Sequence, residues 1–412
     1  MMHHTKTHQQ MAFLMVAAAW LVSPMARADV VTDWHAKASA LLVEARLGSQ
    51  PACRVLAIVH TAVYEATNAI TQRYPARGLP LEAAPGAAVE AAVTAAHHAT
   101  LVQLVPSHQA AIATAYQAAL ALIPDGPVKT AGLAVGEQAA AAILAWRADD
   151  STATGETYRP HTTAGVYVPT VLPVASQWPQ RKPWLMMSPA QFRPGPPPAL
   201  TSAVWTRDYN EIKALGGQHS TRRTAEQTDI ARFWAATQPP IYDGVVRAVA
   251  IMPGREVTQN ARLFAAVAQA TDDALIAVFD AKYHYYFWRP VTAIRNGDRD
   301  GNAATERDPA WMPLIDTPMH PEYPCAHCIL SATIGTVLQA EIGPGPMPPL
   351  TTTSPTAQGA ARSWATIDDF MQEVAQARIY DGVRYRTSTE VGTAMGKQIG
   401  ALAVAKYLRA PQ

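Results

Sequence analysis

The dominant feature of the chain is the recurrence of apolar residues every three to four positions, which is the spacing of an amphipathic helix. The pattern is interrupted by Pro106, by the turn Asp125-Gly126-Pro127 and by other segments rich in Pro or Gly, which separate one expected helix from the next. There is no internal repeat and no convincing β-hairpin pattern. Helices are expected over residues 34–45, 53–70, 88–105, 108–123, 130–146, 202–215, 225–236, 259–281 and 326–340, and again within 367–408.

The periodicity stops between about residues 150 and 198, where Pro and Thr are frequent. A region of this length without periodicity indicates a functional loop or an excursion over the domain surface. The sequence therefore predicts an all-α fold of two packed helical bundles. We expect an N-terminal helical region with this Pro-rich loop at residues 29–200, and a C-terminal helical region at residues 201–412.

The first 28 residues have the features of a targeting segment. An apolar run over residues 11–25 follows Lys6 and ends in the triplet Ala26-Arg27-Ala28, whose small first and third residues suit signal peptidase. A buried first helix is the alternative. Because no later stretch reaches about 18 uninterrupted apolar residues, no membrane span is expected after cleavage. The mature protein is expected to be periplasmic or secreted.

Composition narrows the possible partners. Of the 412 residues, 49% are apolar and only 16% are charged, which suits a globular domain. The formal net charge of +1 provides no general attraction to nucleic acid or to an anionic membrane. We therefore expect no nucleic-acid partner, and any preference for anions must come from a local cluster of charges.

Three segments in the C-terminal half carry candidate chemistry. In the first, Lys282 and Arg289 are two helical turns apart, so both side chains can reach the same side. The second, residues 320–327, places Pro, small residues and a His at an expected helix start, where free backbone N–H groups favour an anion. The third supplies Arg378 and Arg384.

Together these segments resemble the three-part signature of the PAP2 and vanadium haloperoxidase superfamily. That signature is Lys, six residues, Arg-Pro; then Pro-Ser-Gly-His; then Ser-Arg, five residues, His, three residues, Asp. In the family, the Lys and both Arg side chains hold phosphate or vanadate, and the Ser and Gly donate to it. The first His is the acid/base, and the second bonds to phosphorus or vanadium. The stretch at residues 287–294 looks more like the haloperoxidase branch.

The resemblance implies roles for particular residues. Lys282, Arg289 and Arg378 would hold the oxyanion, and His327 would be the acid/base. In the second segment, Cys325 stands in place of the Ser and Ala326 in place of the Gly, and both would donate to the oxyanion. The third segment departs from the family pattern at two positions, that of the second His and that of the Asp.

Arg384 occupies the position of the second, axial His, and Ser388 that of the Asp that orients it. No His follows His327, so a shift of register does not restore the motif. A guanidinium cannot act as a nucleophile on phosphorus, which should close the phosphohistidine route. An additional Arg should nevertheless strengthen oxyanion binding through its planar fork of donors.

The cysteines allow several interpretations. The spacing of Cys325 and Cys328 is a poor match to disulfide geometry, although a helix start leaves some freedom. A zinc site is disfavoured, since these two residues and His327 on one helix start cannot surround a tetrahedral ion. Cys325 could instead be a reactive thiol, because nearby cations and a helix N-terminus lower a thiol pKa. Cys53 is expected to be a buried thiol.

Other charged residues have simpler explanations. Arg386 and Glu390 are four apart on an expected helix and are predicted to form an ion pair. His320 and Glu322 either line the mouth of the site or only cap a loop. The Asp- and Asn-rich stretch at residues 298–302 is predicted to be a polar turn.

Three functions follow from the resemblance. The first is a vanadium haloperoxidase-like enzyme that uses vanadate and hydrogen peroxide to oxidise halide or an organic acceptor, with phosphate as a competing anion. The second is a PAP2-type phosphatase acting on a phosphoester through Cys325 or an activated water. The third is a catalytically silent oxyanion-binding protein. His327 and Arg384 are the catalytic candidates beside Cys325: His327 favours an enzyme, whereas Arg384 weakens both enzyme hypotheses.

Overall fold

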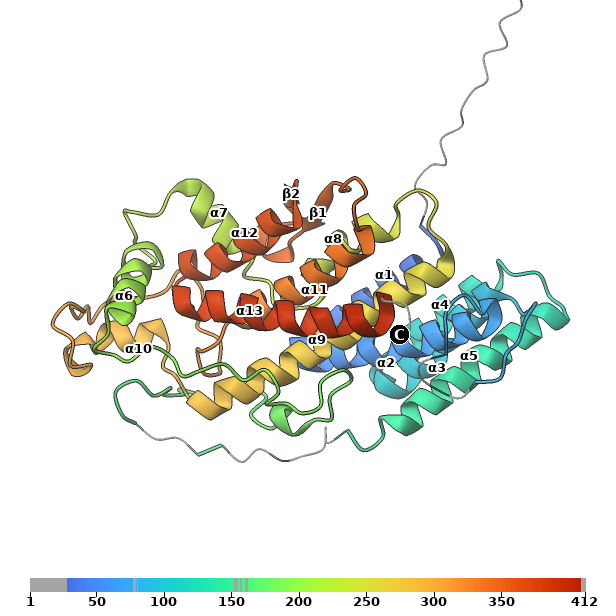
Figure 1. The fold of residues 1–412 in the computed structure, drawn as a ribbon, viewed down its shortest axis with the longest axis horizontal. Coiled ribbons are helices and arrows are strands. Elements are labelled where there is room, and N and C mark those ends of the chain that lie inside the picture. Colours follow the sequence, from blue (N-terminus) through green and yellow to red (C-terminus); the bar gives the residue numbers. More distant parts are fainter. Residues whose placement is uncertain are drawn as a thin grey trace, which may run out of the picture.

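The computed structural model describes residues 28–76, 79, 81–150, 155, 158–159 and 162–408. The predicted targeting segment, residues 1–28, lies outside this part except for its last residue. The predicted all-α class is confirmed, since helices dominate the described residues (Figure 1). The helices are α1 (Val30–Glu44), α2 (Ser49–Thr71), α3 (Val89–Leu104), α4 (Gln109–Leu120), α5 (Pro127–Trp146), α6 (Ala203–Leu215), α7 (Ala225–Phe233), α8 (Pro240–Ala250), α9 (Val257–Tyr285), α10 (Pro290–Arg295), α11 (Ala326–Ile342), α12 (Ile367–Tyr380) and α13 (Arg386–Ala403).

The 29-residue helix α9 runs through the middle of the elongated molecule (Figure 1). It contacts α2, onto which α3 and α5 pack, and it also contacts α11 and α13, which pack against each other. Nearly every residue of α9 from Thr258 to Tyr283 is buried, and most are apolar or small on all sides of the helix, apart from a few buried charged residues such as Asp272, Asp273 and Lys282. The larger of two clusters of buried apolar residues in the described part of the chain extends from Val31 to Tyr407 and includes residues of α2 and α3 as well as of α11 and α13. The division at residue 200 stays a prediction.

Local sequence explains where several helices begin. Asp29 accepts from the backbone N–H of Thr32 at 2.9 Å, while the Thr32 hydroxyl accepts from the backbone N–H of Asp29 at 2.8 Å. This reciprocal capping box provides two of the backbone donors at the start of α1 with partners. Glu256 and Gln259 form the same arrangement at the start of α9.

The Pro-rich segment between α5 and α6 is attached to α9 by two buried carboxylates. Asp273 accepts from the three consecutive backbone N–H groups of residues 184–186, at 2.7–2.9 Å. Asp272 pairs with Arg181 at 2.6 Å. Backbone N–H groups in a segment without regular structure lack the carbonyl partners that a helix provides. The carboxylate of Asp273 accepts from them instead. The described residues of the segment are largely irregular, as the loss of periodicity predicted, and the choice between a functional loop and a surface excursion stays open.

The expectation of no β-hairpin was wrong. The strands β1 (Leu350–Thr353) and β2 (Ala361–Trp364) form an antiparallel pair, with Leu350 opposite Trp364. Each strand has only four residues, which is too short to give a clear alternating pattern beside the surrounding prolines. Helix α8 was also missed. It begins at Pro240, a residue that favours a loop in the sequence but is well suited to the first turn of a helix.

Two helix boundaries position the candidate chemistry. Helix α9 extends to Tyr285, beyond the predicted end at residue 281, so Lys282 lies in its last turn. The expected helical region at 367–408 is broken between Tyr380 and Arg386. Gly382 has a φ of 85° in this break, a conformation that is costly for residues with a side chain. The break brings Arg378 and Arg384 onto the two sides of one turn.

Close packing of α11 and α13 depends on glycine. A Cβ atom at Gly396 would lie 2.3 Å from the backbone oxygen of Ile329. We expect Gly396→Ala to lower the free energy of unfolding by about 1–3 kcal/mol, because overpacking outweighs the gain in helix propensity of roughly 1 kcal/mol. The comparison is Gly195→Ala, where a Cβ meets nothing within 4 Å. Denaturant unfolding of both variants measures the effect, and a Gly396→Ala protein as stable as the wild type would contradict this packing.

Candidate active site

Lys282 is completely buried, and its ammonium group is enclosed by the turn before α11. Its Nζ donates to the backbone oxygens of Pro321 at 3.2 Å and Glu322 at 2.8 Å, and also to that of Pro324. Burial lowers the Lys282 pKa well below its ordinary value, and the charges of Arg384 and then Arg289 lower it further. A lysine has three N–H donors, and in this arrangement all three have carbonyl partners.

Arg289, the residue before α10, is the second predicted cation, and it is also buried. Its Nε donates to the backbone oxygen of His320 at 2.8 Å, and one Nη donates to that of Val383 at 3.0 Å. The other Nη lies 3.2 Å from Nδ1 of His320. Burial lowers the pKa of Arg289 to about 10, so the guanidinium stays charged at neutral pH.

Arg378 and Arg384 lie on either side of the turn between α12 and α13. One Nη of Arg378 donates to the backbone oxygen of Trp234 at 2.7 Å and pairs with a carboxyl oxygen of Asp381, also at 2.7 Å. Arg384 donates through Nη1 to the backbone oxygen of Glu322. Both side chains are at least 98% buried, and burial and Arg289 lower the pKa of Arg384 well below its ordinary value. The structure thus brings all four predicted cations together.

His327 lies in the first turn of α11, where the charges of Arg378, Arg384 and Lys282 reach it. Its pKa is lowered well below the ordinary value, chiefly by burial and then by Arg378, so the imidazole is neutral. Its Nε2 lies 2.9 Å from the backbone oxygen of Ala236, which can only accept. This contact places the proton on Nε2 and leaves the lone pair on Nδ1.

Cys325 and Cys328 form a disulfide with a Cα–Cα distance of 5.4 Å. The expectation of unsuitable geometry was wrong, because Cys325 precedes α11 with extended backbone angles, which turns its side chain toward the first helical turn. In this state Cys325 has no thiol and cannot be a nucleophile or a donor to an oxyanion. Its sulfur accepts from the backbone N–H of Cys328 at 3.1 Å, as a helix cap does. Ala326, the first residue of α11, still offers a backbone N–H at the helix start.

Two buried carboxylates accompany the cations. Asp381, to which sequence analysis gave no role, pairs with Arg378 and accepts from the backbone N–H of Val383 at 3.1 Å. Glu322 accepts from the backbone N–H of Tyr385 at 3.1 Å through Oε1. Glu322 is completely buried and accepts from the backbone N–H of the residue before α13, so whether it lines the mouth of the site or caps a loop stays open. In the sequence, Glu322 could be noticed as an acidic residue between two prolines, next to the candidate site.

The environment of the Glu322 carboxyl is unusual. Burial raises its pKa, while the charges of Arg384, Lys282 and Arg289 act in the opposite direction. Ser388 lies beside it and favours the charged form. However, neither Oε2 of Glu322 nor Oγ of Ser388 makes a full hydrogen bond to any of the described residues.

Charge does not balance within this cluster. Among the described residues, two carboxylates accompany the four cations, which leaves a formal excess of two positive charges. Buried charge is strongly unfavourable unless it is paired. In addition, the Nε atoms of Arg378 and Arg384 are buried without a hydrogen-bond partner among the described residues. Unpaired donors and excess positive charge both fit an anion bound beside these two guanidinium groups.

The predicted ion pair between Arg386 and Glu390 was wrong. Arg386 instead pairs through two donors with Glu211 of α6, including a contact of 2.8 Å from Nε. Glu390 lies 3.9 Å from Arg207. Spacing along one helix favours a pair between them, but a neighbouring helix supplied a bidentate partner with better geometry.

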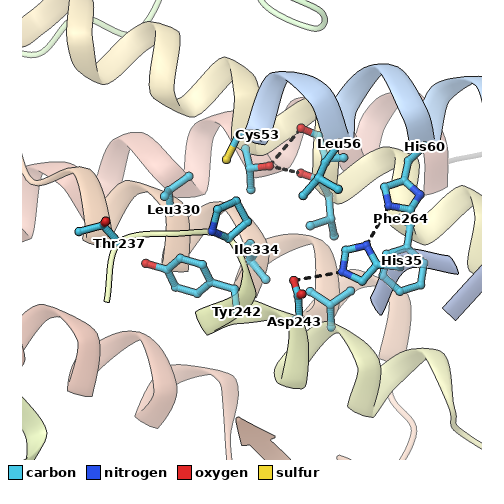
Figure 2. Close-up of a pocket in the computed structure, with 15 residues that line it drawn as sticks. His35, Cys53, Leu56, His60, Thr237, Tyr242, Asp243, Phe264, Leu330 and Ile334 are labelled. Atoms are coloured by element: carbon cyan, nitrogen blue, oxygen red, sulfur yellow. Dashed lines mark hydrogen bonds and ion pairs between the residues drawn. The ribbon is translucent and has the colours of Figure 1, made fainter. Parts of the chain in front are cut away.

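A separate cavity of about 40 Å³ lies between α1, α2, α8 and α9, and sequence analysis did not predict it (Figure 2). Asp243 lies 3.0 Å from Nε2 of His35, whose Nδ1 lies 2.8 Å from Nε2 of His60. Burial lowers the pKa of His60 well below its ordinary value, so this ring is neutral. The volume would hold roughly two or three water molecules. Its residues come from distant helices, so no local motif marks them.

The cavity adjoins the cation cluster. Tyr242, whose side chain lines the cavity in Figure 2, donates to the backbone oxygen of His327 at 3.5 Å. Thr237 lines the cavity and follows Ala236, which holds the His327 ring. The segment before α8 therefore contacts both the small cavity and the start of α11.

Comparison with known proteins bears on the family and on the fold. The family described as the VCPO second helical-bundle domain matches residues 262–412, which include every predicted site residue. Vanadium chloroperoxidase of Curvularia inaequalis is 29% identical over 176 residues, covering 35% of this chain and 28% of that protein. The similarity in sequence thus spans little more than a quarter of that relative's length.

The fold is similar over a longer region. The crystal structure of the first bacterial vanadium-dependent iodoperoxidase has a TM-score of 0.78 at 22% identity, covering 92% of this chain and 97% of that one. A holo-type bacterial vanadium-dependent chloroperoxidase has a TM-score of 0.71 at 17% identity, covering 87% and 91%. The matched domain, the sequence relative and the shared fold together support the assignment of this chain to the vanadium haloperoxidase and PAP2-like superfamily that its three motifs predicted.

Proposed function

We propose that this protein binds vanadate or phosphate in the cluster of buried cations and, with vanadate, acts as a haloperoxidase-like enzyme on peroxide and a halide or organic acceptor. The observation that carries the proposal is the formal excess of two positive charges among Lys282, Arg289, Arg378, Arg384 and their two carboxylates. A tetrahedral dianion would neutralise that excess and accept from donors that lack partners.

The free donors indicate which residues would hold the anion. All three N–H groups of Lys282 are engaged by backbone oxygens, so in this conformation it contributes charge and supports the turn before α11. Arg378 and Arg384 each have a free Nε donor, and Arg289 has two of its five N–H groups unused. The backbone N–H of Ala326 at the helix start would add a further contact.

His327 is the residue in this cluster best suited to proton transfer. Its neutral ring presents Nδ1 as an acceptor, since Nε2–H is held by the backbone oxygen of Ala236. When bound, vanadate would supply the electrophilic centre at which peroxide is activated. The surrounding cations lower the His327 pKa further, so the ring would release a proton readily after accepting one.

A catalytically silent oxyanion-binding protein is the second candidate, and Arg384 is the observation that favours it. In the motif alignment Arg384 stands where the family has its second His; it is buried, and a guanidinium would not bond to vanadium as an imidazole would. A phosphatase that uses Cys325 as nucleophile is disfavoured while Cys325 is held in the disulfide. Activation of water by His327 would be the phosphatase route that remains.

The role of Arg384 in binding can be tested with a charge-conserving change. Arg384→Lys keeps the positive charge but loses the Nε donor and the planar fork. We expect phosphate affinity to fall by about ten- to a hundredfold, since a hydrogen bond to a charged group contributes about 1.5–3 kcal/mol. Calorimetric titration with phosphate measures the affinity of each protein. The matched control is Arg386→Lys, two residues away and paired with Glu211, which should bind normally; equal losses in both variants would count against the assignment.

Peroxidase activity can be tested by measuring bromide and iodide oxidation with peroxide, with and without vanadate. We expect vanadate-dependent turnover that phosphate inhibits. His327→Gln should lower the rate by about 10²–10⁴, typical for loss of an acid/base group, with little change in vanadate affinity. If vanadate binds but no turnover occurs with either halide, the protein is the silent binding protein.

We further propose export with cleavage after Ala28. Cleavage there would leave Asp29 as the first residue, and Asp29 caps α1 and accepts from Nδ2 of Asn260 at 2.9 Å. The cut therefore preserves the side chain that starts the first helix. Mass spectrometry of the protein from the periplasm or culture medium should find Asp29 at the N-terminus, whereas uncleaved protein confined to the cytoplasm would refute export.

A further inference from the structure

The unpartnered atoms of the cation cluster are of two kinds. The Nε groups of Arg378 and Arg384 are buried donors that lack an acceptor among the described residues. Oε2 of Glu322 is a buried acceptor that lacks a donor among the same residues. Arginine donors alone would fit any oxyanion. Oε2 of Glu322, in contrast, would stay unpaired beside an anion that has no O–H group to donate.

Glu322 is fixed close to the guanidinium groups. Its backbone oxygen accepts from both Arg384 and Lys282, and its Oε1 is held by the backbone N–H of Tyr385. The charges of Arg384, Lys282 and Arg289 all act on its carboxyl group. The carboxyl group makes no ion pair within 4.0 Å with these cations among the described residues, so an oxyanion bound between it and the guanidinium groups would place an oxygen beside a second negative group. That proximity is unfavourable unless the oxygen carries a proton that it can donate to Glu322.

Resting on the proposed oxyanion function, we propose that Glu322 selects oxyanions that retain a proton, such as hydrogen phosphate or hydrogen vanadate, over fully deprotonated ones such as sulfate. Phosphate at neutral to mildly alkaline pH keeps at least one O–H, whereas sulfate has none. With sulfate bound, the Glu322 carboxylate would lack a hydrogen-bond donor and would be repelled by the negative sulfate oxygens. A buried group that must pair with a ligand O–H can reject the analogue without it by about 10⁴ or more, and like-charge contact adds to that selectivity.

The neighbouring hydroxyl of Ser388 provides the rival explanation. If this hydroxyl rotated to donate to Oε2, Glu322 would be satisfied by the protein itself and would not require a protonated ligand. Glu322 would then act on phosphate and sulfate through charge alone. The ratio of the two affinities separates these cases.

The experiment is calorimetric titration of the full-length mature protein with inorganic phosphate and with sulfate at mildly alkaline pH. We expect the wild type to bind phosphate at least about a hundredfold more tightly than sulfate, a conservative fraction of the selectivity of such sites. In Glu322→Gln the amide can donate to sulfate, so the ratio should fall at least tenfold, mainly through tighter sulfate binding. The matched control is Glu341→Gln, a buried carboxylate paired with Arg255 and Arg262, in which the ratio should not change.

The outcomes are distinct. Equal binding of phosphate and sulfate by the wild type overturns the selection by Glu322 but leaves the proposed oxyanion function standing. Binding of neither anion refutes the proposed function itself. An unchanged ratio in a folded Glu322→Gln protein also overturns the inference. If the Glu322→Gln protein does not fold, the ratio of phosphate to sulfate affinity in the wild type still tests whether the site selects a protonated oxyanion.

Discussion

The structure depends on the burial of four cationic side chains in a helical interior where, in the part of the chain that the structure describes, two carboxylates oppose them. Removing charge from water costs several kcal/mol per ion even in relaxed proteins. Backbone oxygens meet part of this cost, because the turn before α11 offers three of them to Lys282 and the break between α12 and α13 offers one to Arg289. Because the carbonyl groups of these irregular segments are not engaged in helical hydrogen bonds, they are free to accept from the buried cations.

The same arrangement explains why the cations stay together without complete neutralisation. Lys282 is fixed in the last turn of the central helix α9, and Arg378 and Arg384 flank a turn that Gly382 permits. Each of these three side chains is at least 98% buried. A bound dianion would complete the balance of charge. Arg384, which stands at the motif position of the second His, adds a positive charge to the cluster, and its guanidinium is not a nucleophile.

Much of this could be predicted from sequence, because the motif residues stand at fixed spacings within single helices or turns. The expectation that Lys282 and Arg289 are two turns apart on a continuous helix was wrong, because α9 ends at Tyr285 and Arg289 precedes α10. What was missed depends on contacts between distant segments. The partner of Arg386 is Glu211 on another helix, and the cavity of Asp243, His35 and His60 combines three helices.

Other misses have local causes. The disulfide between Cys325 and Cys328 depends on the extended backbone of one residue before the helix, which spacing alone does not reveal. The strands of the hairpin are too short to produce an alternating pattern. Asp381 was overlooked because a single acidic residue after a helix is more often a solvated end than a buried partner.

The most direct test of the central claim is a crystal structure of the protein soaked with vanadate, with the vanadium located by its anomalous scattering. The account predicts a single strong peak among Arg289, Arg378 and Arg384, near Nδ1 of His327. A peak elsewhere on the protein, or none at this cluster under conditions in which vanadate saturates binding in solution, would contradict it.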